Sequence, residues 1–194
     1  NAVLIPGYDP TKSTYEIKST IEVSVGQTLV LGPGTTLRFA QGAALACKGQ
    51  LWLAGDANRP VRLEPSDRSW EGVRLEGGEA FGVFSHANLS GAVPDFLARF
   101  IDKAQVSQGG ALSVLSGARA IVADSVLQDS QAGGRGAGGG LHVSGQANVV
   151  RTTVKGCRAA NGGGIYAGPL SELDVTNCTL TGNTAENDGG GFAA

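Results

Sequence analysis

The sequence lacks several features that would assign it directly to a biochemical class. It contains only three cysteines, Cys47, Cys157 and Cys178. Their odd number and wide spacing exclude a complete disulfide framework and a zinc site. Cys157 and Cys178 fall in two different inward columns, where we expect inert thiols that fill the interior; metal or redox use is the alternative. No stretch approaches the roughly 18 apolar residues of a membrane span, and no signal peptide opens the chain at Asn1. We therefore predict no transmembrane segment and, if the protein is secreted, a sequence from which the signal peptide is absent.

An excess of positive charge is also lacking. The chain has 15 Lys and Arg residues against 17 Asp and Glu residues, which gives a formal net charge of -2. Nucleic-acid binding depends largely on basic side chains that displace counterions from phosphates, and this sequence has no basic stripe. The composition therefore argues against a nucleic-acid partner.

Glycine, in contrast, is abundant, and its placement is regular. The chain has 31 glycines among 194 residues, whereas average usage is about 7%. Paired or triple glycines stand immediately before an apolar, any, apolar triplet at residues 109–114, 138–143, 162–167 and 189–194. These copies recur every two to three dozen residues, which is the repeat length typical of a solenoid.

Short segments of alternating apolar and polar residues indicate what each repeat contains. They begin near residue 21 and recur at residues 28–31, 35–39, 43–47 and 51–54, separated by short glycine turns. Strands this short do not easily fold back on themselves as hairpins. They fit the coils of a parallel β-helix, in which each strand pairs with the equivalent strand of the next coil. We therefore predict an all-β solenoid.

Two apolar columns are predicted to point inward along this solenoid. The first column consists of Phe84, Ile121, Val149 and Val175, and the second of Leu89, Val126, Val154 and Leu180. Like residues stacked along the axis make a continuous core from repeats that cannot bury a face alone.

The chain reads as a single domain with four segments. Residues 1–19 are predicted to form an N-terminal cap, residues 20–91 the early coils and residues 105–194 the glycine-repeat coils. Between them, residues 92–104 have apolar side chains at helical spacing, with Pro94 suited to the first turn. We expect a short amphipathic helix there that packs on the β-helix flank; a lid or partner-docking role is the alternative.

The C-terminal coil is predicted to be truncated. The sequence stops at residue 194 in the middle of a repeat, without a capping segment. An uncapped coil presents unpaired strand edges, so end-to-end self-association is expected there.

The glycine repeats resemble those of a known group of proteins. Residues 109–112, 138–141 and 162–165, with Leu180-Thr181-Gly182-Asn183, are similar to the GGA[ILV] and FxxN repeats of bacterial polymorphic outer membrane proteins and related secreted β-helix proteins. The resemblance covers roughly residues 105–194. It implies a right-handed parallel β-helix from a secreted or cell-surface bacterial protein, in which the motifs shape turns. Asp129 and Cys157 are predicted to be the counterparts of Asn183.

No cofactor or metal is predicted. Residues 134–139 match the pattern G-x-G-x-x-G, but a strand-like triplet follows where a dinucleotide site needs a helix. Calcium-binding glycine repeats need a regular Asp after the glycines, and only Asp188 comes near.

One outward column is the candidate ligand-binding site. The residue between the two apolar positions of each glycine-repeat strand gives Arg74, Ser113, His142 and Tyr166 on successive coils, about 4.8 Å apart, and then Ala193. Glu71 and Glu76 lie close to Arg74 in sequence and complete the candidate set. His142 and Tyr166 are suited to stacking on a sugar or a peptide side chain. A solvent-facing column without a ligand is the alternative.

Three functions fit these observations. The first is a non-catalytic scaffold or adhesion module that binds a polysaccharide or a cell-surface protein, for which no catalytic residue is assigned. The second is a polysaccharide lyase or glycoside hydrolase fragment that uses the neighbourhood of Glu71, Arg74, Glu76, His142 and Tyr166. The third is a self-associating solenoid module.

Overall fold

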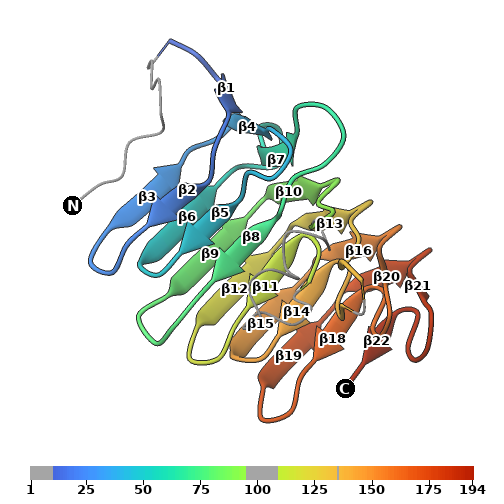
Figure 1. The fold of residues 1–194 in the computed structure, drawn as a ribbon. Coiled ribbons are helices and arrows are strands. Elements are labelled where there is room, and N and C mark those ends of the chain that lie inside the picture. Colours follow the sequence, from blue (N-terminus) through green and yellow to red (C-terminus); the bar gives the residue numbers. More distant parts are fainter. Residues whose placement is uncertain (1–10, 95–108, 135) are drawn as a thin grey trace.

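The structure is a stack of parallel β-strands. The computed structural model describes residues 11–94, 109–134 and 136–194, and these residues form 22 strands (Figure 1). Three sheets run the length of the stack, with a fourth sheet of two strands, and every strand pair is parallel. The predicted all-β, parallel solenoid architecture is thereby confirmed.

The chain passes from sheet II to sheet III to sheet I in each coil. Sheet I consists of β1 (Thr14–Ile17), β4 (Thr36–Phe39), β7 (Val61–Pro65), β10 (Ala87–Ser90), β13 (Val126–Gln128), β16 (Thr153–Lys155) and β20 (Thr179–Thr181). Sheet II consists of β2 (Ile21–Val23), β5 (Leu45–Cys47), β8 (Val73–Leu75), β11 (Leu112–Val114), β14 (Leu141–Val143), β18 (Ile165–Ala167) and β22 (Phe192–Ala193). Sheet III consists of β3 (Thr28–Leu31), β6 (Gln50–Ala54), β9 (Phe81–Ser85), β12 (Arg119–Ala123), β15 (Gln146–Val150) and β19 (Glu172–Thr176). The small sheet pairs β17 (Arg158–Ala159) with β21 (Thr184–Ala185).

The core lies between the three long sheets. Alternate residues of each strand point inward, so that Leu29 and Leu31 of β3 are buried while Val30 between them is exposed. In the next coil, Leu51 and Leu53 of β6 continue the same two inward rows. Each coil therefore covers the apolar residues of its neighbour, which a single coil could not do for itself.

The structure corrects one residue in the first predicted inward column. Phe84 is in register with Val122 rather than Ile121; Val122 is fully buried, whereas Ile121 is 42% exposed. Residues 120–123 are all apolar, so alternation alone does not fix which of them point inward. A slip of one residue turns every side chain of a strand to the opposite face.

The second predicted column needs the same correction. Leu89 is in register with Leu127 rather than Val126, and Leu127 is fully buried. Val154 and Leu180 follow it in register, as predicted.

Polar side chains stacked at the corner between sheets III and I satisfy backbone groups of the neighbouring coil. Ser125 Oγ accepts a hydrogen bond from the Ala87 N–H (3.0 Å) and donates to the Ala123 carbonyl (2.7 Å). Thr152 takes the same place one coil later, where its Oγ1 accepts from the Ser125 N–H (3.4 Å). Cys178 follows on the next coil. These stacked groups meet the hydrogen-bonding needs of buried backbone where the chain leaves the sheets.

A second polar row lies beyond sheet I. Asn183 Oδ1 accepts from the Cys157 N–H (3.0 Å), and Asn183 Nδ2 donates to the Val154 carbonyl (2.9 Å). Ser130 holds the equivalent place two coils before Asn183, because it stands three residues after the inward residue Leu127. Ser130, not Asp129, is therefore the counterpart of Asn183, while the predicted equivalence of Cys157 is confirmed.

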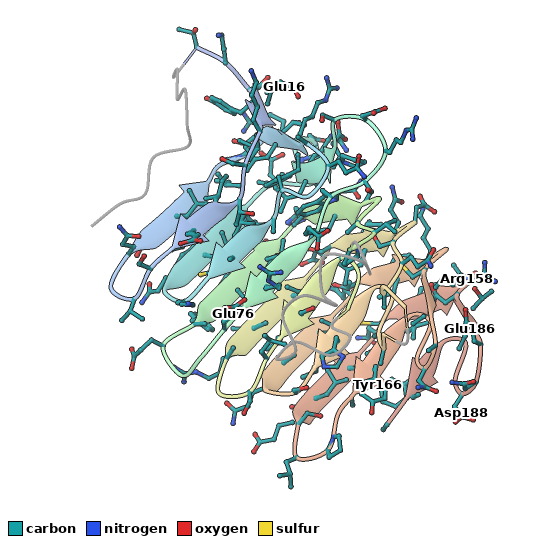
Figure 2. The ribbon with its side chains drawn as sticks, in the orientation of Figure 1. Glu16, Glu76, Arg158, Tyr166, Glu186 and Asp188 are labelled. Atoms are coloured by element: carbon teal, nitrogen blue, oxygen red, sulfur yellow. The ribbon has the colours of Figure 1, made fainter. Side chains whose placement is uncertain are left out.

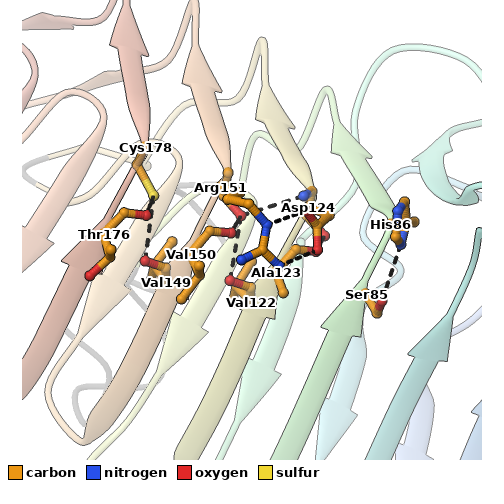
Figure 3. A network of polar contacts seen from close by, with 12 residues as sticks. Ser85, His86, Val122, Ala123, Asp124, Val149, Val150, Arg151, Thr176 and Cys178 are labelled. Carbon is orange, nitrogen blue, oxygen red and sulfur yellow. Dashed lines mark hydrogen bonds and ion pairs between the residues drawn. The ribbon is translucent and has the colours of Figure 1, made fainter. Parts of the chain in front are cut away.

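The outer side of the first corner carries a row of residues with left-handed backbone. His86, Asp124, Arg151 and Asn177 have φ angles of 49°, 52°, 47° and 54°. Arg151 donates from Nε and Nη2 to the two carboxylate oxygens of Asp124, both at 2.7 Å (Figure 3). These hydrogen bonds hold the pKa of Asp124 below its ordinary value. The pair links two coils at the surface.

The predicted N-terminal cap and the predicted helix are only partly covered by the described residues. Strand β1 pairs in parallel with β4, so the stack already includes residues from Thr14 onward, within the predicted cap. The predicted helix at residues 92–104 falls almost entirely outside the described residues. Only residues 92–94 are described, and Ala92 forms an isolated parallel bridge with Trp70. The described parts of the chain contain no helix.

Candidate functional site

The outward residues of sheet II form the column predicted from the sequence. Along the stack it runs Glu22, Ala46, Arg74, Ser113, His142, Tyr166 and Ala193. The predicted alignment is thereby confirmed, whereas a ligand for this column stays a prediction. Glu71 precedes β8 and Glu76 follows it, so both lie at the ends of the Arg74 strand.

His142 is held firmly on β14. Its Nδ1 lies 3.2 Å from the Ala137 carbonyl oxygen, and its Nε2 lies 2.8 Å from Ser144 Oγ. A carbonyl oxygen only accepts, so Nδ1 carries the proton and the Ser144 hydroxyl donates to Nε2. Burial lowers the pKa of His142 below its ordinary value, against a smaller opposite effect of the hydrogen bond to Ala137. The imidazole is therefore neutral at pH 7, with both nitrogens engaged.

Tyr166 stacks on this fixed imidazole. The two ring centroids are 5.4 Å apart and the ring planes differ by 25°. Figure 2 shows Tyr166 projecting from β18, in the later part of the stack. Ala193 is the next residue in register, and its methyl group is too small to cover a phenol ring. One face of Tyr166 therefore rests on His142, and in the next coil of the described chain the residue in register with it is the small Ala193.

Ser113 divides the column into two parts. It is buried, with only 1% of its surface exposed, although it occupies an outward position of β11. It is therefore a poor ligand contact, in contrast to the prediction from its alignment. Arg74 lies on one side of it and His142 on the other.

Arg74 contacts one of the predicted acidic residues and shares a pocket with the other. Its Nε donates to Glu76 Oε1 at 3.1 Å, and both side chains are partly exposed. Arg74 also lines a surface pocket of about 430 Å³ together with Glu71. The remaining lining residues are Thr20, Gln41, Gly42, Ala44 and Ser69. Glu71, Arg74 and Glu76 thus share one neighbourhood, whereas His142 and Tyr166 form a second one.

Reactive groups are scarce in the described structure. Burial raises the pKa of the Cys47 and Cys157 thiols to about 11, so both are protonated and poorly nucleophilic at neutral pH. Within residues 11–94, 109–134 and 136–194, no three His, Cys, Asp or Glu side chains are placed to hold a metal ion. These residues also form no helix of the length and hydrophobicity that a bilayer crossing requires.

Sequence reasoning missed the groups that hold the site in place. Ser144, which hydrogen-bonds His142, stands two residues after it, just past the end of β14, and this spacing was the available signal. Thr20, Gln41 and Ser69 come from separate coils, and no local pattern places them beside Arg74.

Comparison with protein-family models, with curated proteins and with solved structures finds no match in any of the three.

Proposed function

We propose that the chain is a non-catalytic scaffold or adhesion module of a secreted or cell-surface bacterial protein, and that it binds a glycan through the His142–Tyr166 pair. A surface protein that offers an exposed apolar side chain is the other partner this pair fits. The coils are proposed to be right-handed, because crossover connections between parallel strands are right-handed in nearly all proteins.

The stacked pair is the observation that carries this proposal. A neutral imidazole with both nitrogens engaged supports one face of Tyr166, so the phenol ring is held in place before any ligand arrives. A ring fixed in advance loses little conformational entropy on binding. The face of the ring toward Ala193 suits the apolar C–H face of a sugar, and the phenol hydroxyl offers a polar contact at its edge.

The test is a binding measurement on a panel of immobilised glycans, followed by titration of the best ligand. Tyr166→Ala should weaken binding about tenfold or more, because it removes the platform. Ala193→Trp should also weaken binding, because the indole fills the space over Tyr166. Glu16→Ala on the outer face of sheet I is the matched control and should bind as the wild-type chain does. Saturable binding that Tyr166→Ala leaves unchanged would remove this site from the proposal, and no binding across the panel would remove the glycan.

A second candidate function, polysaccharide cleavage, has one observation in its favour. The pocket beside β8 brings the Glu71 carboxylate and the Arg74 guanidinium together with two hydroxyl-bearing side chains. A carboxylate with a basic residue nearby is one pairing that can abstract or donate a proton on a sugar. Turnover of any polysaccharide that Glu71→Gln abolishes would support this function. Absence of turnover across a broad panel would count against it.

A further inference from the structure

The outer face of sheet III differs from the outer faces of the other two sheets. On sheet I, the outward row includes Glu16, Arg38 and Glu64, and Arg38 lies 3.0 Å from Glu64. On sheet II, the outward row is the mixed polar column already described. On sheet III, Val30, Trp52, Val83 and Ile121 follow one another in register. We call these four residues the apolar stripe.

The apolar stripe is accessible along its length. Val30 is 61% exposed, Trp52 38% and Ile121 42%, and Val83 is partly exposed. One row to the side, the residues in register carry no charge; they are Ala54, Ser85, Ala123 and Val150. This uncharged second row widens the surface that the apolar stripe offers to a partner. Isolated exposed apolar residues are ordinary, but a contiguous set marks an interaction site.

Aromatic contacts hold the centre of the stripe in place. Trp52 meets the ring of Phe81 edge to face, with centroids 6.1 Å apart. The Arg119 guanidinium lies 5.8 Å from the centroid of the same Phe81 ring. Tryptophan held in a defined position is the residue type most often found to dominate binding at protein interfaces.

The spacing and charges of sheet III favour a second copy of this chain as the occupant. The stripe repeats at the spacing of the coils, about 4.8 Å, and the same sheet of another copy has the same repeat. The stripe ends in polar residues, because Asn148 and then Asp174 continue its row on β15 and β19. Only the first four strands of the sheet therefore offer an apolar surface.

Two symmetric face-to-face arrangements keep the strands of the two sheets aligned, and charge discriminates between them. A two-fold axis along the solenoid places each residue of the row opposite itself, so Asp174 faces Asp174 of the second copy, which is repulsive. A two-fold axis parallel to the strands reverses the order of the coils. If this axis passes between β6 and β9, Val30 of one copy faces Ile121 of the second copy, and Trp52 faces Val83 of the second copy. Strand β19 then extends beyond the contact. Arg119 then faces Thr28, and no like charges meet.

We propose that the outer face of sheet III binds a second copy of this chain through the apolar stripe, with the two solenoid axes antiparallel. The contact is isologous, as the symmetry of a closed dimer requires. The stripe covers only four strands, so the dimer is weak and its population rises with protein concentration. The proposal is independent of the glycan site, because sheet II faces away from this contact.

Sedimentation velocity over a range of concentrations tests the association. The wild-type chain should show a concentration-dependent dimer, and Trp52→Ser should raise the dissociation constant about tenfold or more. Leu170→Ser, at a fully exposed apolar residue in the turn before β19, is the matched control and should leave the constant unchanged. Phe192→Ser separates this contact from end-to-end association, because Phe192 lies on the last coil. A monomer at all concentrations, or association removed by Phe192→Ser and not by Trp52→Ser, would overturn the proposal.

Cross-linking tests the orientation. In a Cys178→Ser background, whose other two thiols are buried, Val30→Cys and Ile121→Cys chains are treated with a short bis-maleimide. The mixture of the two chains should cross-link, and neither chain alone should do so efficiently. Efficient cross-linking of Val30→Cys with itself would indicate the parallel arrangement and contradict the proposed one.

Discussion

At the scale of single residues, His142 is distinguished by an imidazole that is partly buried, hydrogen-bonded at both nitrogens and stacked on a second ring. Each ring nitrogen has a protein partner and the imidazole stacks on Tyr166, so both position and tautomer are fixed. Protonation at Nε2 would replace an acceptor with a donor facing the Ser144 hydroxyl, which can reorient. The cost of charging the ring therefore comes mainly from burial, as the lowered pKa indicates.

The lowered pKa of His142 predicts a specific pH dependence of stability. The folded chain has the lower pKa, so between the folded pKa and the ordinary value of 6.5 the unfolded chain binds more protons. Stability should fall as the pH drops through about 6.5 and level off below the folded pKa. Urea unfolding at a series of pH values measures this effect.

A substitution at His142 assigns the effect. His142→Gln should reduce the slope of the stability profile just below pH 6.5, because the titrating imidazole is removed. An unchanged slope in the His142 variant would show that another group is responsible.

At the scale of the elements, the glycine triplets are turn-forming sequences. Gly162 has a φ angle of +57°, in the left-handed region that favours glycine. Gly163 has ordinary backbone, but a Cβ there would lie against the carbonyl oxygens of Thr184 and Gly190 in the next coil. The motif therefore combines a backbone requirement with a close approach between coils, which explains why it predicts architecture and not activity.

This account predicts a large difference between two glycine substitutions. Gly163→Ala should destabilise the chain by roughly 1–3 kcal/mol, because the added methyl group meets backbone oxygens that are fixed in a sheet. Gly32→Ala is the matched control, since a Cβ at Gly32 meets nothing within 4 Å and its φ angle is not positive. It should be neutral or slightly stabilising. Equal destabilisation of the two variants in denaturant unfolding would contradict the packing of the glycine triplets.

The sequence predicted the elements better than the details of register. Alternation and glycine turns identified the parallel solenoid and the column from Arg74 to Tyr166, because both depend on a period of two within one strand. Ile121 was wrongly predicted to point inward in place of Val122, because residues 120–123 are all apolar and show no alternation of apolar and polar residues. The pocket beside Arg74 could not be predicted, since Thr20, Gln41 and Ser69 meet there only through the stacking of coils.

At the scale of the whole molecule, the three sheets present three different surfaces. Sheet I carries charges, sheet II the His142–Tyr166 pair, and sheet III the apolar stripe. The strands β19, β20 and β22 are edge strands, and Val175 and Phe192 there are 40% and 48% exposed. End-to-end association of the 194-residue chain through this coil stays a prediction, and the Phe192→Ser variant described above tests it.

The central claim is that sheet II, and not another face of the solenoid, is the ligand-binding surface. The most direct measurement is a ¹H–¹⁵N NMR titration of the labelled chain with the best glycan from the panel. The account predicts that the largest amide shift changes cluster at His142, Tyr166 and Ala193. Changes centred on Trp52 and Ile121 of sheet III, or saturation without any change near Tyr166, would contradict it.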